Sequence, residues 1–127
     1  FHGEYVNFDP IWCWPKPVQV GGPPIWLGAN SKWAFDRIAE YCDGWMPIGG
    51  SGSGGMEQLQ TACEKQGRNA KDMDIALFGA PADLDFVKGR IDQGFTDMIF
   101  GLPQTSSDGV LKQLDKIAEV ANAARQG

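Results

Sequence analysis

Four short apolar runs, each bounded by glycine or proline, alternate with segments whose apolar residues recur every three or four positions. The first pattern is typical of buried strands, and the second is typical of helices that cover one face of a sheet. The predicted strands are 24–28, 45–48, 75–78 and one within 95–102, and the predicted helices begin near residues 31, 56, 83 and 107. This alternation predicts an α/β fold with parallel strands and right-handed crossovers.

The last predicted helix has the strongest periodicity in the chain. Its apolar residues form one continuous stripe of Val110, Leu111, Leu114, Ile117, Ala118 and Ala121. A stripe of this kind predicts a helix whose apolar face is packed against the rest of the domain.

The length of the chain limits the architecture to four strand–helix units. Two units are alike, because Tyr41–Trp45 and Phe95–Ile99 each place an aromatic residue, an aspartate and a core residue at matching steps. Weak repetition is expected of a (β/α) barrel, but a closed eight-stranded barrel takes about 250 residues. The 127 residues therefore predict half of a (β/α)8 TIM barrel over 25–127, preceded by an extended lead-in, rich in proline and tryptophan, over 1–24.

The composition of the chain argues against several classes of function. The 11 Lys and Arg against 16 Asp and Glu give a net charge of −5, which argues against a nucleic-acid partner. The apolar runs are too short to span a membrane. An odd number of cysteines without a C-x-x-C pair, and a single histidine, His2, argue against a disulfide framework, a metal site and a Ser-His-Asp triad. We expect a soluble protein of the reducing cytoplasm.

The first candidate binding site follows the first predicted strand. Gly28 and Ala29 are small enough for a ligand to approach the backbone, and Asn30 and Ser31 add side-chain donors at the start of a helix. The alternative is that Asn30 or Ser31 only caps the helix, as any helix requires.

The second candidate site follows the second predicted strand. Gly49 and Gly50 open a run of glycine and serine whose backbone N–H groups can turn toward a phosphate. A solvent-exposed loop is the alternative. The run also matches G-x-G-x-x-G, but Asp72 and Asp74 precede the next strand instead of ending it, which disfavours an independent NAD site.

Several conspicuous residues have structural explanations. Asp43 and Asp97 lie at strand entrances, opposite the catalytic face of a barrel, and Asp83 and Asp85 lie in the first turn of a helix. Trp26 and Trp45 are expected in the core. Five tryptophans within 45 residues exceed what a small core needs, so we expect some to line a pocket or to cover a partner surface.

Motifs along nearly the whole chain resemble the bacterial luciferase-like monooxygenase family, and within it the branch that depends on the deazaflavin coenzyme F420. They are Phe1–Tyr5, Pro15–Gln19, Pro24–Ser31, Asp43–Pro47, Gly67–Arg68 and Gly101–Pro103. The order and spacing of these motifs correspond to the C-terminal half of the family's (β/α)8 barrel.

This resemblance implies a flavin- or deazaflavin-dependent oxidoreductase or monooxygenase acting on a small-molecule substrate. It implies that Gly28, Ala29, Asn30 and Ser31 hold the cofactor phosphate, of coenzyme F420 or alternatively FMN, with Gly49 and Gly50 at the next strand end. Ala29 departs from the family's commoner glycine. The family's substrate residues come from the other half of the barrel, so no catalytic residue is assigned here. We expect a homo-oligomer formed through the exposed half-barrel edges, and a non-catalytic half-barrel is the alternative.

Overall fold

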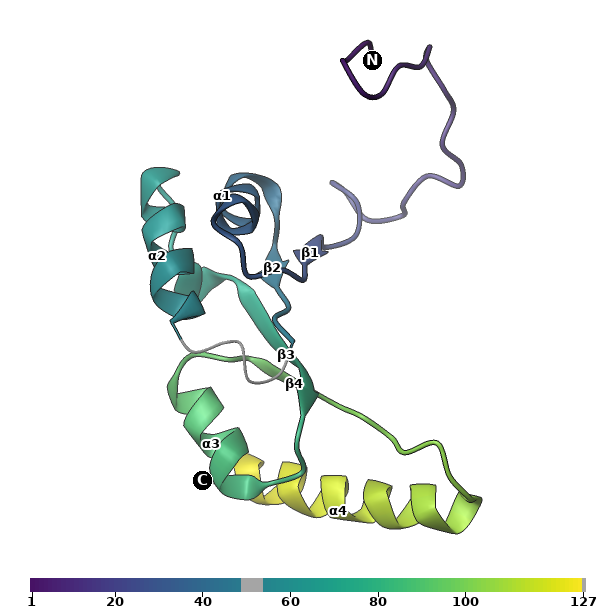
Figure 1. Ribbon diagram of the computed structural model, residues 1–127, viewed down its shortest axis with the longest axis vertical. Coiled ribbons are helices and arrows are strands. Elements are labelled where there is room, and N and C mark those ends of the chain that lie inside the picture. The colour runs from purple at the N-terminus through teal and green to yellow at the C-terminus, as the bar shows by residue number, and fades with distance from the viewer. Residues whose placement is uncertain (49–53, 127) are drawn as a thin grey trace.

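The computed structural model describes residues 1–48 and 54–126. Its elements in chain order are β1 (Trp26–Leu27), α1 (Lys32–Tyr41), β2 (Gly44–Trp45), α2 (Gly55–Lys65), the 3-10 helix η1 (Ala70–Asp72), β3 (Asp74–Ala80), α3 (Leu84–Asp92), β4 (Asp97–Phe100) and α4 (Ser107–Arg125). The four predicted strands and four predicted helices are therefore confirmed in their predicted order (Figure 1).

The strands form one parallel sheet in the order β1-β2-β3-β4. Trp26 pairs with Gly44, and Gly44 pairs with Asp74, so the first residues of β1, β2 and β3 lie side by side in the sheet. Consecutive strands are neighbours throughout, as in a barrel, whereas a dinucleotide-binding sheet reverses its strand order at the binding crevice. The α/β half-barrel predicted from the sequence is confirmed.

The first two strands are shorter than their apolar runs. Pairing of β2 stops at Trp45, because Pro47 has no N–H to donate to a neighbouring strand. Ile48 rejoins the sheet through an isolated bridge to Phe78. β3 is thus the longest strand of the sheet, and β4 pairs along most of its length.

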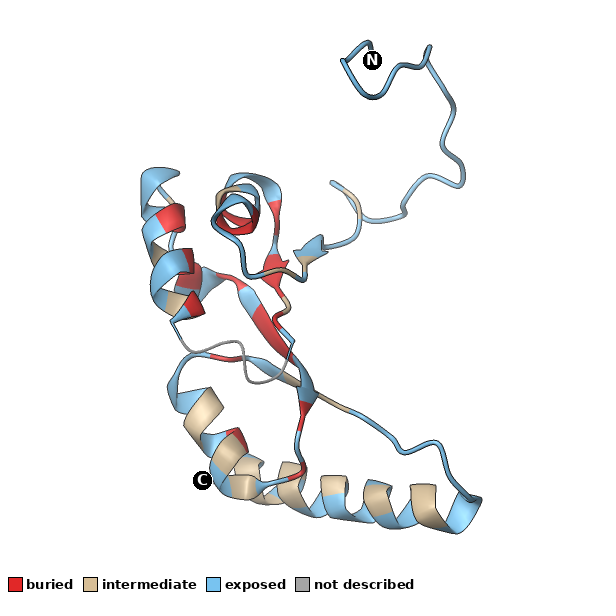
Figure 2. Ribbon diagram, viewed as in Figure 1, coloured by how far each residue is buried: buried red, intermediate tan, exposed pale blue. Residues whose placement is uncertain are grey.

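The hydrophobic core lies between the sheet and helices α1 and α2. Trp45 is fully buried at its centre, with the ring of Phe35 at 5.3 Å in an edge-on arrangement and the ring of Phe95 at 6.2 Å. Ile38, Leu59 and other apolar side chains of α1, α2 and β3 surround it. Figure 2 shows buried residues concentrated on these elements and absent from α4.

Most helix boundaries match the capping residues read from the sequence. The side chain of Asp83 accepts a hydrogen bond from the Phe86 N–H at the start of α3, at 2.8 Å. After α2, Gly67 has φ of +67°, and after α3, Gly94 has φ of +94°. Both glycines therefore stop a helix in a conformation that other residues rarely adopt.

One packing prediction was wrong, and a second was confirmed only in part. Trp26 was expected in the core but is 37% exposed, because it lies on the face of the sheet opposite the helices. The long helix α4 was expected to be packed on its apolar stripe, yet none of its described residues is buried. α4 packs mainly against α3, and β4 is the edge strand of the sheet in the part of the chain that the structure describes.

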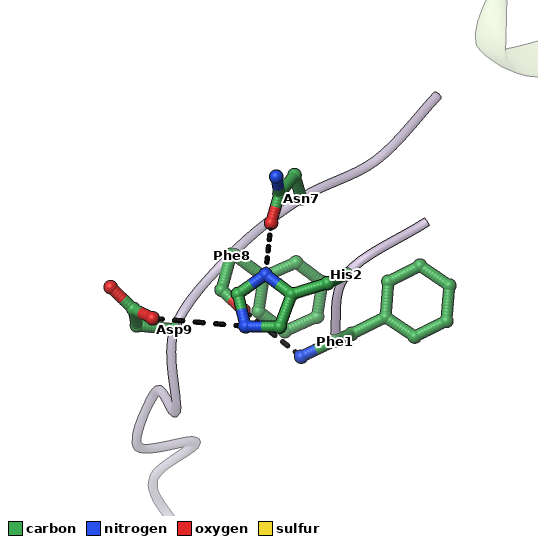
Figure 3. Close-up of polar contacts among 5 residues, drawn as sticks. All are labelled: Phe1, His2, Asn7, Phe8 and Asp9. Carbon is green, nitrogen blue, oxygen red and sulfur yellow. Dashed lines mark hydrogen bonds and ion pairs between the residues drawn. The ribbon is translucent and has the colours of Figure 1, made fainter. Parts of the chain in front are cut away.

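Residues 1–24 precede the sheet as an extended segment that runs away from the body (Figure 1). Its tip is closed by bonds between the backbones of Phe1 and Phe8, in which the amino terminus donates to the Phe8 carbonyl at 3.0 Å and the Phe8 N–H donates to the Phe1 carbonyl at 2.9 Å. Figure 3 shows His2 at this tip between Asn7, to which its Nδ1 is hydrogen bonded, and Asp9, at 4.0 Å from its Nε2. No helix among the described residues has the length and hydropathy to cross a membrane.

Candidate functional site

The loop Gly28–Ser31 connects the carboxyl end of β1 to the first turn of α1. Met46, which follows β2, donates its N–H to the Leu27 carbonyl at 3.1 Å, so the ends of β1 and β2 lie side by side. In parallel α/β folds, ligands bind at this edge of the sheet. The loop therefore lies where a (β/α) barrel places its site.

Trp45 fixes the middle of this loop. Its indole Nε1 donates to the Ala29 carbonyl at 2.8 Å, while its ring is buried among core side chains. An indole N–H needs an acceptor when it is buried. The bond thus satisfies the tryptophan and holds the Ala29 backbone against the core.

Ser31 is the N-cap of α1. Its Oγ accepts a hydrogen bond from the Ala34 N–H at 3.2 Å, which confirms the capping interpretation. A serine hydroxyl carries one donor and two acceptor positions, so the capping bond leaves its O–H able to donate. Asn30 and Ser31 are both exposed.

The charge around the start of α1 favours an anion. The first turn of α1 has no acidic residue and begins with Lys32. By contrast, the other α-helices of the described ranges carry Glu57, Asp85 and Asp108 in their first turns. The partial positive charge of the α1 N-terminus is therefore not already neutralised by a carboxylate.

Gly28 has a structural reason to be glycine. A Cβ at this position would lie 3.1 Å from the Met46 carbonyl oxygen, closer than most side-chain contacts. The close approach of β1 and β2 explains this residue without a ligand. Gly49 and Gly50, the second half of the predicted site, lie outside the described residues.

The aspartates interpreted as structural have structural partners. The Asp43 carboxylate accepts from the Ile25 N–H at 2.8 Å and ties β1 to the entrance of β2. The Asp97 carboxylate accepts from the Thr96 hydroxyl at 2.8 Å. Both lie at strand entrances, away from the Gly28–Ser31 loop.

The two buried thiols are kept in their neutral form. Burial raises the pKa of Cys42, and the neighbouring Asp43 carboxylate raises it further against the opposing effect of Arg68. Burial likewise raises the pKa of Cys63, again opposed by Arg68. Both thiols are structural, because a reactive cysteine needs a lowered pKa and access to solvent.

Arg68 caps the end of α1. The sequence placed this residue in a family motif but did not indicate the capping role. Its guanidinium donates to the carbonyls of Ile38, Ala39 and Cys42 at 3.3, 2.9 and 2.8 Å. These are the last carbonyls of α1, so the side chain caps that helix from the start of the next unit. The partners lie 26 to 30 residues away in sequence, which hides the contact from spacing arguments.

None of the described cavities is lined by the Gly28–Ser31 loop itself, although one of them begins at Lys32, the residue after Ser31. The largest, about 740 Å³, is a groove between α2, η1 and the turn after α3 that includes Met56, Ala70 and Gly94. A second cavity of about 380 Å³ lies between α1 and α2. Within residues 1–48 and 54–126, His, Cys, Asp and Glu side chains form no group able to hold a metal ion.

Comparison with known proteins decides the family. The sequence profile of luciferase-like monooxygenases matches residues 1–82, which include β1, the Gly28–Ser31 loop and all of β3. This chain belongs to the luciferase-like monooxygenase family. The match covers more than half of the chain, and the parallel strand–helix order agrees with half of a luciferase-like TIM barrel.

Curated relatives of this luciferase-like chain occur in mycobacteria. It is 31% identical over 120 residues to the uncharacterized protein Rv0953c of Mycobacterium tuberculosis and to the uncharacterized protein Mb0978c of Mycobacterium bovis. The matched region covers 93% of this chain and 42% of each relative. The chain thus spans less than half the length of these relatives.

Proposed function

We propose that this luciferase-like chain carries part of the phosphate site for coenzyme F420, or alternatively FMN, in an oxidoreductase or monooxygenase that acts on a small molecule. The observation that supports it best is the Gly28–Ser31 loop, which runs from the end of β1 into a helix N-terminus free of acidic residues. Membership of the luciferase-like family supports the reaction class.

The residues present fit a phosphate group. Donors suited to an anion are the exposed Asn30 side chain, the Ser31 hydroxyl and the backbone N–H groups at the start of α1. Lys32 adds a positive charge at the same end. The small side chain of Ala29 leaves the backbone accessible, as the commoner glycine of the family would.

When bound, a flavin or deazaflavin supplies the hydride chemistry. The chain's own contribution is binding and orientation: Ser31 donates to a phosphate oxygen while its Oγ still caps α1, and Trp45 prevents the Ala29 carbonyl from turning toward the anion. Gly49 and Gly50 at the neighbouring strand end are proposed to reach the same phosphate or the substrate. No residue of this chain is assigned to the reacting atoms.

A non-catalytic half-barrel is the second candidate. It is supported by the coverage of 42% of the relatives, because substrate residues on the remainder would be missing from a chain acting alone. Such a chain binds the cofactor and shows no turnover, so binding and activity measured on the same sample distinguish the two candidates.

The test is a parallel titration of the purified chain with coenzyme F420, FMN and NAD, followed by tryptophan fluorescence. Trp45 contacts the loop directly and serves as the reporter. We expect saturable binding of F420 or FMN, and at least tenfold weaker binding by Ser31→Asp. Aspartate is a good N-cap, so it preserves α1 while it repels phosphate.

The matched control is Ser106→Asp. Ser106 is the N-cap of α4 and makes no side-chain capping bond, so the same substitution adds the same charge at another helix start. Equal weakening by both variants would contradict a phosphate site at Ser31. Binding of NAD alone would contradict the flavin proposal altogether.

A further inference from the structure

The start of α2 lies directly against the ring of Trp45. Gly55, the first residue of α2, is buried, and a Cβ placed on it would lie 2.3 Å from Cη2 and 2.9 Å from Cζ2 of the indole. Real Cβ atoms essentially never come within 3.0 Å of such an atom. The ring thus occupies the space where any other residue would carry its side chain, and Trp45 imposes glycine at this position.

The same edge of the indole reaches the candidate phosphate loop. Cη2, Cζ2, Cε2 and Nε1 follow one another along this edge, and Nε1 donates to the Ala29 carbonyl at 2.8 Å. The ring therefore lies between the start of α2 and the loop Gly28–Ser31, with one end of its edge against each. Because an aromatic ring is rigid, a displacement at Cη2 also displaces Nε1.

The backbone of Trp45 leaves the ring little freedom to yield. Trp45 is paired with Leu27 of β1 on one side and with Ile75 of β3 on the other. Its ring is fully buried among the side chains of the core. Protein interiors are packed closely enough for one added methyl group to disturb its neighbours. Extra volume at Gly55 must therefore turn the indole or move the start of α2.

The hydrogen bond to Ala29 tolerates little displacement. N–H···O bonds extend over about 2.7–3.2 Å between donor and acceptor. The bond is 2.8 Å long, whereas a Cβ on Gly55 needs about 1 Å more room to reach van der Waals distance from Cη2. A rotation of the ring that supplies this room also moves Nε1, so it lengthens or misaligns the bond. The Ala29 carbonyl is then free to turn toward a bound anion, which it repels.

We infer that Gly55 is a positioning residue for the phosphate loop and acts on it through Trp45. The room that glycine leaves at the start of α2 accommodates the indole, and the indole holds the Ala29 carbonyl toward the core. The loop then presents N–H groups, rather than this carbonyl, to the anion. The inference rests on the proposed function of the loop Gly28–Ser31. It makes the geometry of that loop depend on the second strand–helix unit.

The first test needs no cofactor. Of the five tryptophans, Trp45 alone is buried, so its indole N–H should exchange with solvent more slowly than the other four in proton–nitrogen NMR spectra. We expect Gly55→Ala to shift this resonance and to speed its exchange about tenfold or more, with the exchange of the β3 amides little changed. Gly89→Ala is the matched control and should leave the resonance in place, because the same substitution in α3 meets no atom within 4 Å.

The second test is a double-mutant cycle on the binding of coenzyme F420 and FMN. Isothermal titration calorimetry measures it, because the cycle replaces Trp45 itself. We expect about fivefold or more weaker binding by Gly55→Ala, and a similar loss by Trp45→Phe, which removes the indole N–H. The phenyl ring lacks the atoms that the added methyl group meets, so Gly55→Ala should weaken binding little further in the Trp45→Phe chain. Binding by Gly89→Ala should equal that of the parent chain.

Several results would overturn this role of Gly55. An unchanged indole resonance in a folded Gly55→Ala chain would show that α2 moves instead of the ring. Equal losses of affinity from Gly55→Ala in both backgrounds would show that its effect does not pass through Trp45. If Gly55→Ala does not fold, Trp45→Phe decides alone, and binding as tight as that of the parent chain would overturn the inference.

Failure of the proposed function gives a different pattern. A parent chain that binds neither F420 nor FMN, but whose indole resonance responds to Gly55→Ala, would contradict the phosphate site and support the control of Ala29 by Gly55. Binding by the parent chain that Gly55→Ala and Trp45→Phe leave unchanged would do the reverse. The two proposals are therefore tested separately on the same set of variants.

Discussion

Gly44 leaves room for the indole ring of Trp26 at the entrance of the sheet. A Cβ there would lie 2.6 Å from Trp26 Cδ1 and 2.7 Å from the Asp74 carbonyl oxygen. The backbone oxygen cannot move without breaking the pairing of β2 with β3. Glycine at this position is therefore a requirement of the strand spacing.

Two glycine-to-alanine substitutions should have opposite effects on stability. Gly44→Ala is expected to lower the free energy of unfolding by about 1–3 kcal/mol through overpacking. Gly89→Ala in α3 meets no atom within 4 Å and should raise it by about 0.5–1 kcal/mol, because alanine is the better helix former. Urea unfolding at equal chain concentration measures both, and a stabilising Gly44→Ala would show that the contact is relieved by movement of the strand.

The buried thiols predict a loss of stability at alkaline pH. The pKa values of Cys42 and Cys63 are raised above their ordinary value of 9.0 in the folded chain. The contribution of the two neutral thiols to the free energy of unfolding is therefore complete below pH 9.0. It is lost as the pH rises through the raised pKa values. A Cys42→Ala, Cys63→Ala variant should show a smaller decline above pH 9.0 than the parent chain in urea unfolding, and parallel declines would contradict this cause.

Individual residues were predictable where their partners are local. Ser31, Asp83 and Gly67 were recognised because capping depends on the adjacent turn. Trp26 was misplaced, because its large apolar side chain fits either face of a sheet and only the tertiary structure decides between them. Gly49 and Gly50 remain a prediction.

Helix α1 depends on a neighbouring unit at both ends. Trp45 from β2 holds the loop before it, and Arg68 from beyond α2 donates to three of its last carbonyls. The element most closely connected to the candidate site is thus stabilised by residues that come later in the chain.

Removing the Arg68 cap should destabilise α1 specifically. Arg68→Ala loses three charge-assisted hydrogen bonds, and we expect the free energy of unfolding to fall by about 2–3 kcal/mol. Hydrogen exchange should show the loss of protection first at the last turn of α1. Arg125→Ala, in the exposed last turn of α4, is the control and should change little. A uniform loss of protection across the domain would refute a local capping role.

The order and type of the elements were predictable from periodicity, but the packing of α4 was not. The apolar stripe does lie along one side of the helix. Such a stripe indicates that the helix packs against another element, but it does not identify that element. Similarly, the apolar run at 45–48 predicted a longer β2 than forms, because Pro47 interrupts the pairing.

The segment 1–24 stands apart from the half-barrel. Residues 1–20 are all exposed, and the hydrogen bonds that order the tip join residues of the segment itself. The boundary near residue 24 was predicted from the proline-rich composition of the segment. The half-barrel was predicted from length, since four units cannot close a sheet that takes eight.

Limited digestion with chymotrypsin should cut this segment first. We expect early cleavage after Tyr5 and Trp12, and later cleavage after Tyr41, which is also exposed but lies in a helix. The remaining body should retain its circular dichroism and its urea midpoint. Simultaneous loss of the segment and of the folded signal would show that residues 1–24 contribute to the core.

The sequential strand order also allows two such units to follow one another in a single polypeptide. A polypeptide that repeated this chain in tandem would add β1 of the second repeat directly after α4 of the first, without crossing any existing connection. The segment 1–24 would become the linker, and an extended linker of that length reaches roughly 80 Å. Tandem duplication of this half is therefore topologically sufficient to produce an internally symmetric set of eight strand–helix units.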